Sequence, residues 1–167
     1  MGERLKLRCE DKEDIVVLSS LLQDALVPLA ELAWLPAERC FVLVASRFIW
    51  SECVDVTLPA GEAGIECYSR QNFGVTIEGV TAVKSRGIDI ADRSRILELL
   101  AVTAEAEKGA PPKTGGAPKG GGAAIELVFA GGAGIRIECE RIAVHGQDVG
   151  DPWPTMRRPH HPDIEAA

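Results

Sequence analysis

Residues 123–140 constrain the fold of this chain more than any other stretch of its sequence. Two short runs there place an apolar residue at every second position: Ile125, Leu127 and Phe129, then Ile135, Ile137 and Cys139. A period of two is typical of strands with one buried face and one face in water. The glycine-rich residues 131–134 between the runs allow the positive φ angles of a tight reversal. The stretch therefore predicts an antiparallel hairpin.

The length of the chain suits a single domain with its own core, because 167 residues are too few for two domains of ordinary size. With 46% hydrophobic residues, the chain as a whole is not disordered. We predict one α+β domain over residues 1–150 and a C-terminal tail over 151–167. Residues 107–123 combine glycine, proline and lysine, which predicts a flexible surface loop.

The N-terminal part predicts a short strand followed by a helix. Residues 4–9 alternate charged side chains with leucine, and from Asp11 to Leu26 the apolar residues recur at helical spacing. Asp11 suits the N-cap, because its carboxylate can accept from a free N–H of the first turn. We expect Pro28 to end this amphipathic helix, which needs a surface to cover.

The remaining periodic segments predict strands. They are residues 29–35, 39–50, 66–87 (two strands, broken near Glu78 and Gly79) and 96–106. Intrinsic propensity alone would make 96–106 a helix, but the run is short and leads toward the main hairpin, so we predict a strand. Residues 51–65 read as an irregular loop. Seven or eight short, mostly antiparallel strands suggest a curled β-sheet or small open barrel.

Charge and hydropathy narrow the possible partners. The formal net charge of −7 repels phosphate backbones, so we expect no nucleic-acid partner. No stretch approaches the roughly 20 apolar residues that span a bilayer, and the N-terminus lacks the apolar core of a signal peptide. We expect no membrane association and a cytoplasmic location.

The sequence offers little catalytic chemistry. Its five cysteines are scattered without a Cys-x-x-Cys pair, which argues against a disulfide framework or a zinc site. His160 and His161 could bind a metal with His145, yet adjacent residues on an extended tail point apart. His145 is the one histidine on the body, and its pairing with Cys139 as base and nucleophile is geometrically weak. We expect no metal, cofactor or catalytic residue, which favours a non-enzymatic role.

Several blocks of sequence resemble one family. They are 21–25 (Leu-Leu-Gln-Asp-Ala), 33–36 (Ala-Trp-Leu-Pro), 46–50 (Ser-Arg-Phe-Ile-Trp), 84–89 (Lys-Ser-Arg-Gly-Ile-Asp) and 129–136 (Phe-Ala-Gly-Gly-Ala-Gly-Ile-Arg). In this order they resemble a bacterial, mainly alphaproteobacterial, family known as domain of unknown function DUF 2948. The resemblance covers nearly the whole chain outside 51–65 and 107–123. It implies no activity, cofactor or catalytic residue.

Trp34, Arg47 and Trp50 form the first candidate binding surface. Tryptophan and arginine are the residues that anchor protein interfaces, and aromatic residues are only 5% of this chain. The alternative is that the tryptophans simply close the core. Our leading hypothesis is a binding domain that uses this surface, or a sheet edge, to engage a protein partner or a second copy of itself.

A pocket for a small anionic metabolite is the second candidate. It would lie at the mouth of the sheet and be lined by Arg47 and Arg86, in a sensor or an enzyme. Arg86 belongs to a basic set whose members include Lys84, Arg93 and Arg95. A solvated turn in which these cations pair with neighbouring aspartates is the alternative reading of that set.

Overall fold

The computed structural model describes residues 4–56, 65–106 and 122–155, with side chains at all of these except 50–56, 65–68 and 155. The loop predicted over 107–123 lies almost entirely outside the described residues, as do His160 and His161. Among the described residues, no helix combines the length and apolar character needed to cross a membrane.

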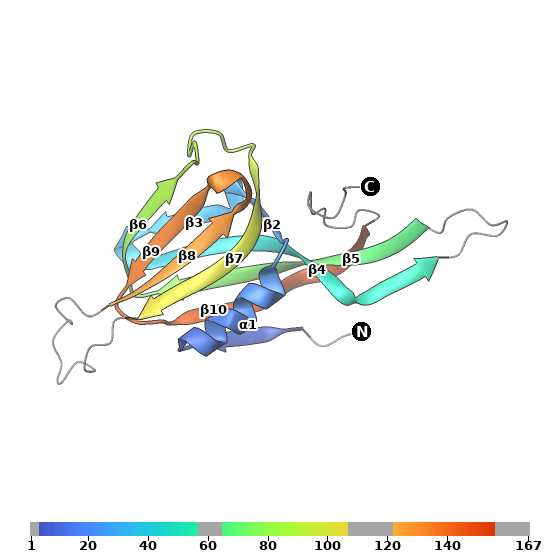
Figure 1. The fold of residues 1–167 in the computed structure, drawn as a ribbon, viewed down its shortest axis with the longest axis horizontal. Coiled ribbons are helices and arrows are strands. Elements are labelled where there is room, and N and C mark those ends of the chain that lie inside the picture. Colours follow the sequence, from blue (N-terminus) through green and yellow to red (C-terminus); the bar gives the residue numbers. More distant parts are fainter. Residues whose placement is uncertain (1–3, 57–64, 107–121, 156–167) are drawn as a thin grey trace.

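The described chain folds into one open, antiparallel sheet with a single α-helix, α1 (Lys12–Leu22) (Figure 1). Its strands are β1 (Lys6–Cys9), β2 (Leu26–Pro28), β3 (Leu32–Leu35), β4 (Cys40–Val56), β5 (Ile65–Glu78), β6 (Val80–Arg86), β7 (Ile96–Ala106), β8 (Ala123–Phe129), β9 (Gly134–Cys139) and β10 (Val144–Thr155). The order across the sheet is β1-β10-β5-β4-β2-β7-β8-β9-β6, with β3 also paired to β4. The mainly antiparallel sheet is thus confirmed, although it contains 10 strands where seven or eight were expected.

The sheet folds back on itself into two layers. One layer contains β1, β10, β5, β4 and β3, and the other contains β7, β8, β9 and β6. The short strand β2 joins them, because Leu26 pairs with Ser46 of β4 and also with Glu98 of β7. Both outer strands of the sheet, β1 and β6, therefore have one neighbour each among the described strands.

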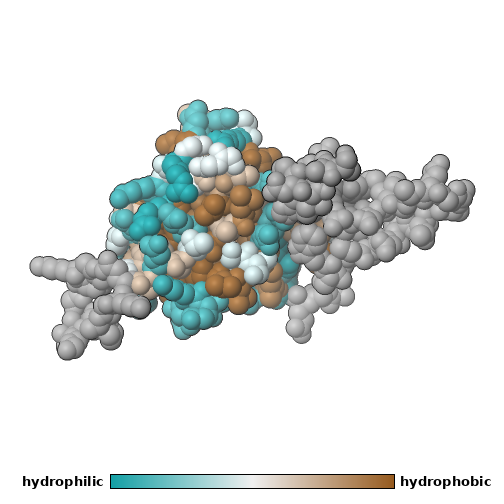
Figure 2. Space-filling view, viewed as in Figure 1, coloured by the Kyte–Doolittle hydropathy of each residue, from teal (hydrophilic) through white to brown (hydrophobic). Residues whose placement is uncertain are grey.

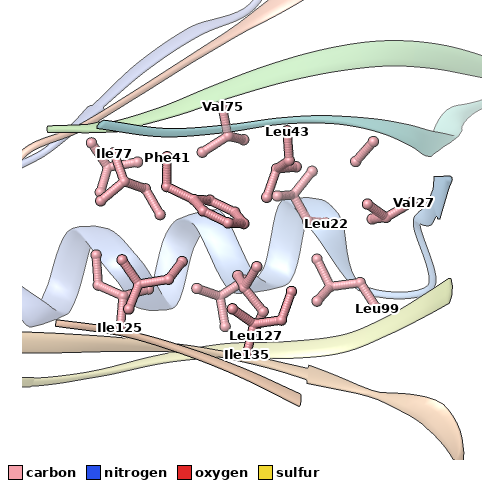
Figure 3. Close-up of a cluster of buried hydrophobic side chains, with 14 of the residues drawn as sticks. Leu22, Val27, Phe41, Leu43, Val75, Ile77, Leu99, Ile125, Leu127 and Ile135 are labelled. Atoms are coloured by element: carbon pink, nitrogen blue, oxygen red, sulfur yellow. The ribbon is translucent and has the colours of Figure 1, made fainter. Parts of the chain in front are cut away.

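The hydrophobic core fills the space between the layers (Figure 3). From one layer come Phe41, Leu43, Val75 and Ile77, and from the other Leu99, Ile125, Leu127 and Ile135. Helix α1 runs along the gap between the layers and buries Ile15, Leu18 and Leu22. Each such side chain removed from water contributes about 1.5–3 kcal/mol, so this interior is the main source of stability.

The hairpin predicted from residues 123–140 is confirmed. Ile125 of β8 lies opposite Ile137 of β9, and all six residues expected to point inward are buried. Gly131 and Gly132 in the connection both have φ of 80°, a conformation that glycine adopts without steric cost.

Helix α1 starts as predicted but ends early. The Asp11 carboxylate accepts from the backbone N–H of Asp14 at 2.8 Å, as an N-cap should. The helix stops at Leu22 rather than near Pro28. Asp24 takes a positive φ of 67°, and the next residues leave the helix to form β2. Pairing with both layers outweighs the helical periodicity of this segment.

The prediction of an irregular loop over 51–65 is wrong at both ends of this segment. Strand β4 continues to Val56 and β5 begins at Ile65, and these two residues pair with each other. A register shift between Ile49 and Val54 lets β4 bend and continue. The glycines and the proline that suggested a loop fall largely at 57–64, outside the described residues. The extended ends of β4, β5 and β10 form an arm at the right of Figure 1.

Strand β7 confirms the strand expected over 96–106. From Leu99 to Ala106 it pairs with β8, so cross-strand bonding prevails over the helical propensity of its alanines and leucines. At the other end of the chain, β10 runs to Thr155 and pairs with β5 beyond residue 150. The last described residues are thus part of the sheet.

Candidate functional site

On the outer surface of the layer formed by β7, β8, β9 and β6, the charged side chains form a network of ion pairs. Arg136 lies 3.6 Å from Glu126 and 3.8 Å from Glu138, Glu138 lies 3.5 Å from Lys84, and Arg86 lies 3.8 Å from Glu126. Figure 2 shows hydrophilic residues over β6 and β9, with hydrophobic colour gathering toward β7 and α1. Charges paired in this way are typical of a solvated surface and do not indicate a binding site.

The outer surface of the opposite layer is hollowed into a groove of about 500 Å³. Two rows of side chains cross the strands β1, β10, β5 and β4 in that order. The first row is Arg8, His145, Thr76 and Val42, and the second is Lys6, Gln147, Gly74 and Val44. The groove thus has one margin of long polar side chains and a floor of short, mainly apolar ones.

The floor of the groove is low at its centre because Gly74, the residue at that point, has no side chain. A Cβ placed there would lie 3.2 Å from Cγ2 of Val149. Val42 and Val44 flank this point and are half-buried, whereas Lys6 and Arg8 on β1 are exposed. Among the described residues, no carboxylate side chain lines this central hollow. An anionic group would therefore meet two cations at the margin and apolar surface on the floor.

Two smaller hollows, of about 250 and 310 Å³, continue the groove. One shares Arg8 and His145 with the centre and adds Arg141, and the other shares Lys6 and Gln147 and adds Arg4. Their borders are mixed in charge, through the pairs Arg8–Glu10 (2.9 Å), Arg4–Asp151 (4.0 Å) and His145–Glu78 (3.5 Å). These side chains are exposed, and such pairs contribute about 0–1 kcal/mol, so a ligand can replace them at small cost.

A buried ion pair fixes β1, and with it the cationic margin. Arg47 of β4 donates to both carboxylate oxygens of Asp148 of β10, each at 3.0 Å. The same carboxylate accepts from the backbone N–H of Leu5 at 2.8 Å, and the Asp148 N–H donates to the Leu5 carbonyl at 2.9 Å. Lys6 follows directly, so Asp148 sets the position where the cations of β1 begin.

Gln71 holds the other end of the groove. Its side-chain amide donates to the carbonyls of Val149 and Gly150, at 2.9 and 3.1 Å, where the register of β10 shifts. Val149 is the residue that overlies Gly74, so this buried glutamine stabilises the wall of the hollow.

The residues expected to form a binding surface are dispersed. Trp34 is half-buried on β3 and packs against the core. Arg47 lies inside, with 12% of its side chain exposed. Trp50 lies on β4, with its side chain outside the description. Arg86 is exposed on β6, in the other layer from Arg47, and covers Gly134. The partner or ligand role expected of these four residues stays a prediction.

Three of the cysteines are poor nucleophiles at neutral pH. Burial raises the pKa of the Cys9 thiol, with help from Asp14 and Asp11, and burial alone raises that of Cys139, each to about 11. The pKa of Cys40 is also raised, chiefly by desolvation. Because the thiolate is the reactive form, these side chains are suited to packing. Among the described residues, no group of three or more potential ligands could hold a metal ion.

Sequence reasoning did not identify the groove. Its members come from four strands that are far apart along the chain and become neighbours only through pairing. One local signal was available: Arg4, Lys6 and Arg8 alternate with Leu5 and Leu7, which places three cations on one face of the first strand.

Comparisons with known proteins identify a family and little more. A family model described as "Protein of unknown function (DUF2948)" matches residues 5–161, which confirms the resemblance seen in the sequence. Neither the curated proteins nor the solved structures contain a match to this chain.

Proposed function

The chain belongs to the DUF2948 family, whose description assigns no function, and we propose from its geometry that it is a non-enzymatic binding domain for a small organic anion. The ligand lies in the groove across β1, β10, β5 and β4. Its anionic group, a carboxylate or a phosphate, contacts Lys6 and Arg8, and its apolar part covers Gly74 between Val44 and Val149.

The central hollow is the observation that carries this proposal. Two exposed cations, a histidine and a glutamine stand on one side of an apolar floor in a protein of net charge −7, and the described residues that line the hollow include no carboxylate. Its volume of about 500 Å³ is in the range of ligand sites. An anion entering this hollow exchanges water for charge-assisted hydrogen bonds at one end and buries apolar surface at the other.

The titratable groups of the groove favour binding over catalysis. His145 is exposed and lies 3.5 Å from Glu78, on the polar margin of the groove. Cys9 and Cys139, whose thiols are buried and protonated at neutral pH, are in the interior and not in the groove. The groove therefore supplies charge, shape and apolar area to hold a ligand, which is the work of a binding domain.

A thermal-shift screen on the full chain tests the proposal. The probes are benzoate, short-chain fatty carboxylates and sugar phosphates, so that the two anionic groups are separated. We expect at least one probe to raise the melting temperature, and Lys6→Gln with Arg8→Gln to weaken its binding at least tenfold. Lys84→Gln is the matched control, because it removes an exposed cation from the other layer.

The floor is tested separately with Gly74→Val. The added side chain occupies the hollow, so binding should be lost while the cationic margin stays intact. No stabilisation by any probe, or stabilisation unchanged by both the Lys6/Arg8 and the Gly74 variants, would show that the groove is not the site.

A further inference from the structure

The outer edge of β1 has a second use, which goes beyond the proposed small-molecule site. We infer that β1 is a docking strand, to which an acidic segment of a partner protein adds as one further antiparallel or parallel strand. Among the described strands, β1 pairs with β10 alone and stands at the end of the sheet. In Figure 1 it forms the lower margin of the molecule, below α1.

The backbone of β1 is correctly oriented for strand addition. The Asp148 N–H donates to the Leu5 carbonyl, so Leu5 faces β10 with its main-chain groups. In an antiparallel ladder the direction alternates, and Leu7 and Cys9, opposite Gly146 and Val144, face β10 as well. The N–H and C=O groups of Lys6 and Arg8 therefore point away from the sheet, where an added strand can bond to them.

The side chains of this edge select the charge of the added strand. Arg4, Lys6 and Arg8 occupy alternate positions and are all exposed. Residues at alternate positions of an added strand lie beside them, so acidic residues at every second position would meet the cations in register. A second copy of β1 would instead bring like charges together, which disfavours pairing of this edge with itself.

The edge is limited in length, and this defines the size of the segment. The Glu10 N–H already donates to the Asp14 carboxylate at 2.9 Å, which closes the edge at the start of α1. Lys6 and Arg8 then provide four main-chain groups. An added strand of about four to six residues suffices to use them, because each residue advances about 3.3 Å.

Fluorescence anisotropy with a labelled peptide of sequence Glu-Val-Glu-Val-Glu tests the inference on the full chain. Two control peptides carry the same charge: in one both valines are replaced by proline, and in the other the three glutamates are contiguous. We expect the alternating peptide to bind at least tenfold more tightly than either control. Equal binding of all three would indicate charge attraction without strand pairing and would overturn the inference.

A pair of variants at Lys6 separates main-chain from side-chain effects. Lys6→Gln and Lys6→Pro remove the same charge, but only proline removes the outward N–H, and an edge strand tolerates proline at such a position. We expect Lys6→Pro to lower peptide affinity at least tenfold below Lys6→Gln, with equal melting temperatures. Equal affinities of the two variants would overturn strand addition.

Light scattering and the Gly74→Val variant complete the test. A dimer that Lys6→Pro converts to a monomer would identify a second copy as the occupant and overturn the acidic-partner inference. Gly74→Val should leave peptide binding unchanged, because the edge does not use the floor of the groove. Failure of the small-molecule proposal is thus distinguishable from failure of the docking strand.

Discussion

Arg47 and Asp148, 101 residues apart in the chain, meet inside the protein as a two-point ion pair with both distances at 3.0 Å. Their side chains are 12% and 5% exposed. The pair joins β4 to β10, and the same carboxylate holds the backbone of Leu5. Arg47, which the sequence suggests for a binding surface, is thus an internal residue that helps to hold the strand carrying Lys6 and Arg8.

Replacing Arg47 with methionine should be strongly destabilising. The change leaves the Asp148 carboxylate buried without its cation, and such losses cost about 3–5 kcal/mol. Urea unfolding measures the effect. Arg4→Met is the control, because the Arg4–Asp151 pair is exposed at 4.0 Å and should change stability by no more than about 0.5 kcal/mol. A similar, small loss in both variants would contradict the structural role of Arg47.

Gly146 is required by close packing against an aromatic ring. A Cβ at this position would lie 2.4 Å from Cε1 of Phe73, nearer than real contacts allow. Gly146→Ala should therefore cost about 1–3 kcal/mol through overpacking. Combining it with Phe73→Leu makes room, so the cost of the alanine should shrink in that background. A double-mutant cycle with no coupling between the two sites would refute the contact.

Ser19 hydrogen-bonds helix α1 to β7. The buried Val102 N–H donates to the Ser19 hydroxyl at 2.9 Å, at a point where β7 has no neighbour on that side among the described strands. Ser19→Ala leaves this N–H without its acceptor, and we expect a loss of about 1–3 kcal/mol. The adjacent Ser20 is exposed and bonds within the helix, to the Val16 carbonyl. Equal effects of Ser19→Ala and Ser20→Ala would exclude the proposed role of Ser19.

Stability should fall at alkaline pH because of the buried thiols. The pKa values of Cys9 and Cys139 are raised from 9.0 to about 11, so the unfolded chain releases these protons first. Their contribution is complete below pH 9 and is lost as the pH rises through about 11. Chemical unfolding at a series of pH values should show this decline. In Cys139→Ala it should be shallower, and an unchanged slope would contradict the assignment.

Much of the fold was predictable from local pattern. The hairpin of β8 and β9, the N-cap at Asp11, the break after Glu78 and the strand at 96–106 all follow from periodicity and turn chemistry. The end of α1 could not be predicted in this way, because the segment that follows it forms β2 by pairing with Ser46 of β4 and Glu98 of β7. The loop predicted over 51–65 is too long, because the glycines and proline of this segment suggested a loop where the ends of β4 and β5 pair with each other.

Local pattern in the sequence predicts most of the strands and the apolar face of each, because these properties depend on side chains two to four residues apart. The alternation of residues 4–8 also places Arg4, Lys6 and Arg8 on one face of an extended segment. The folded chain alone shows that Arg47 is internal, that Lys6 and Arg8 line the same groove as Gly74 and Val42, and that β1 is an outer strand of the described sheet. Those relations depend on strand order, which is set by the burial of apolar surface over the whole chain and leaves no local trace in the sequence.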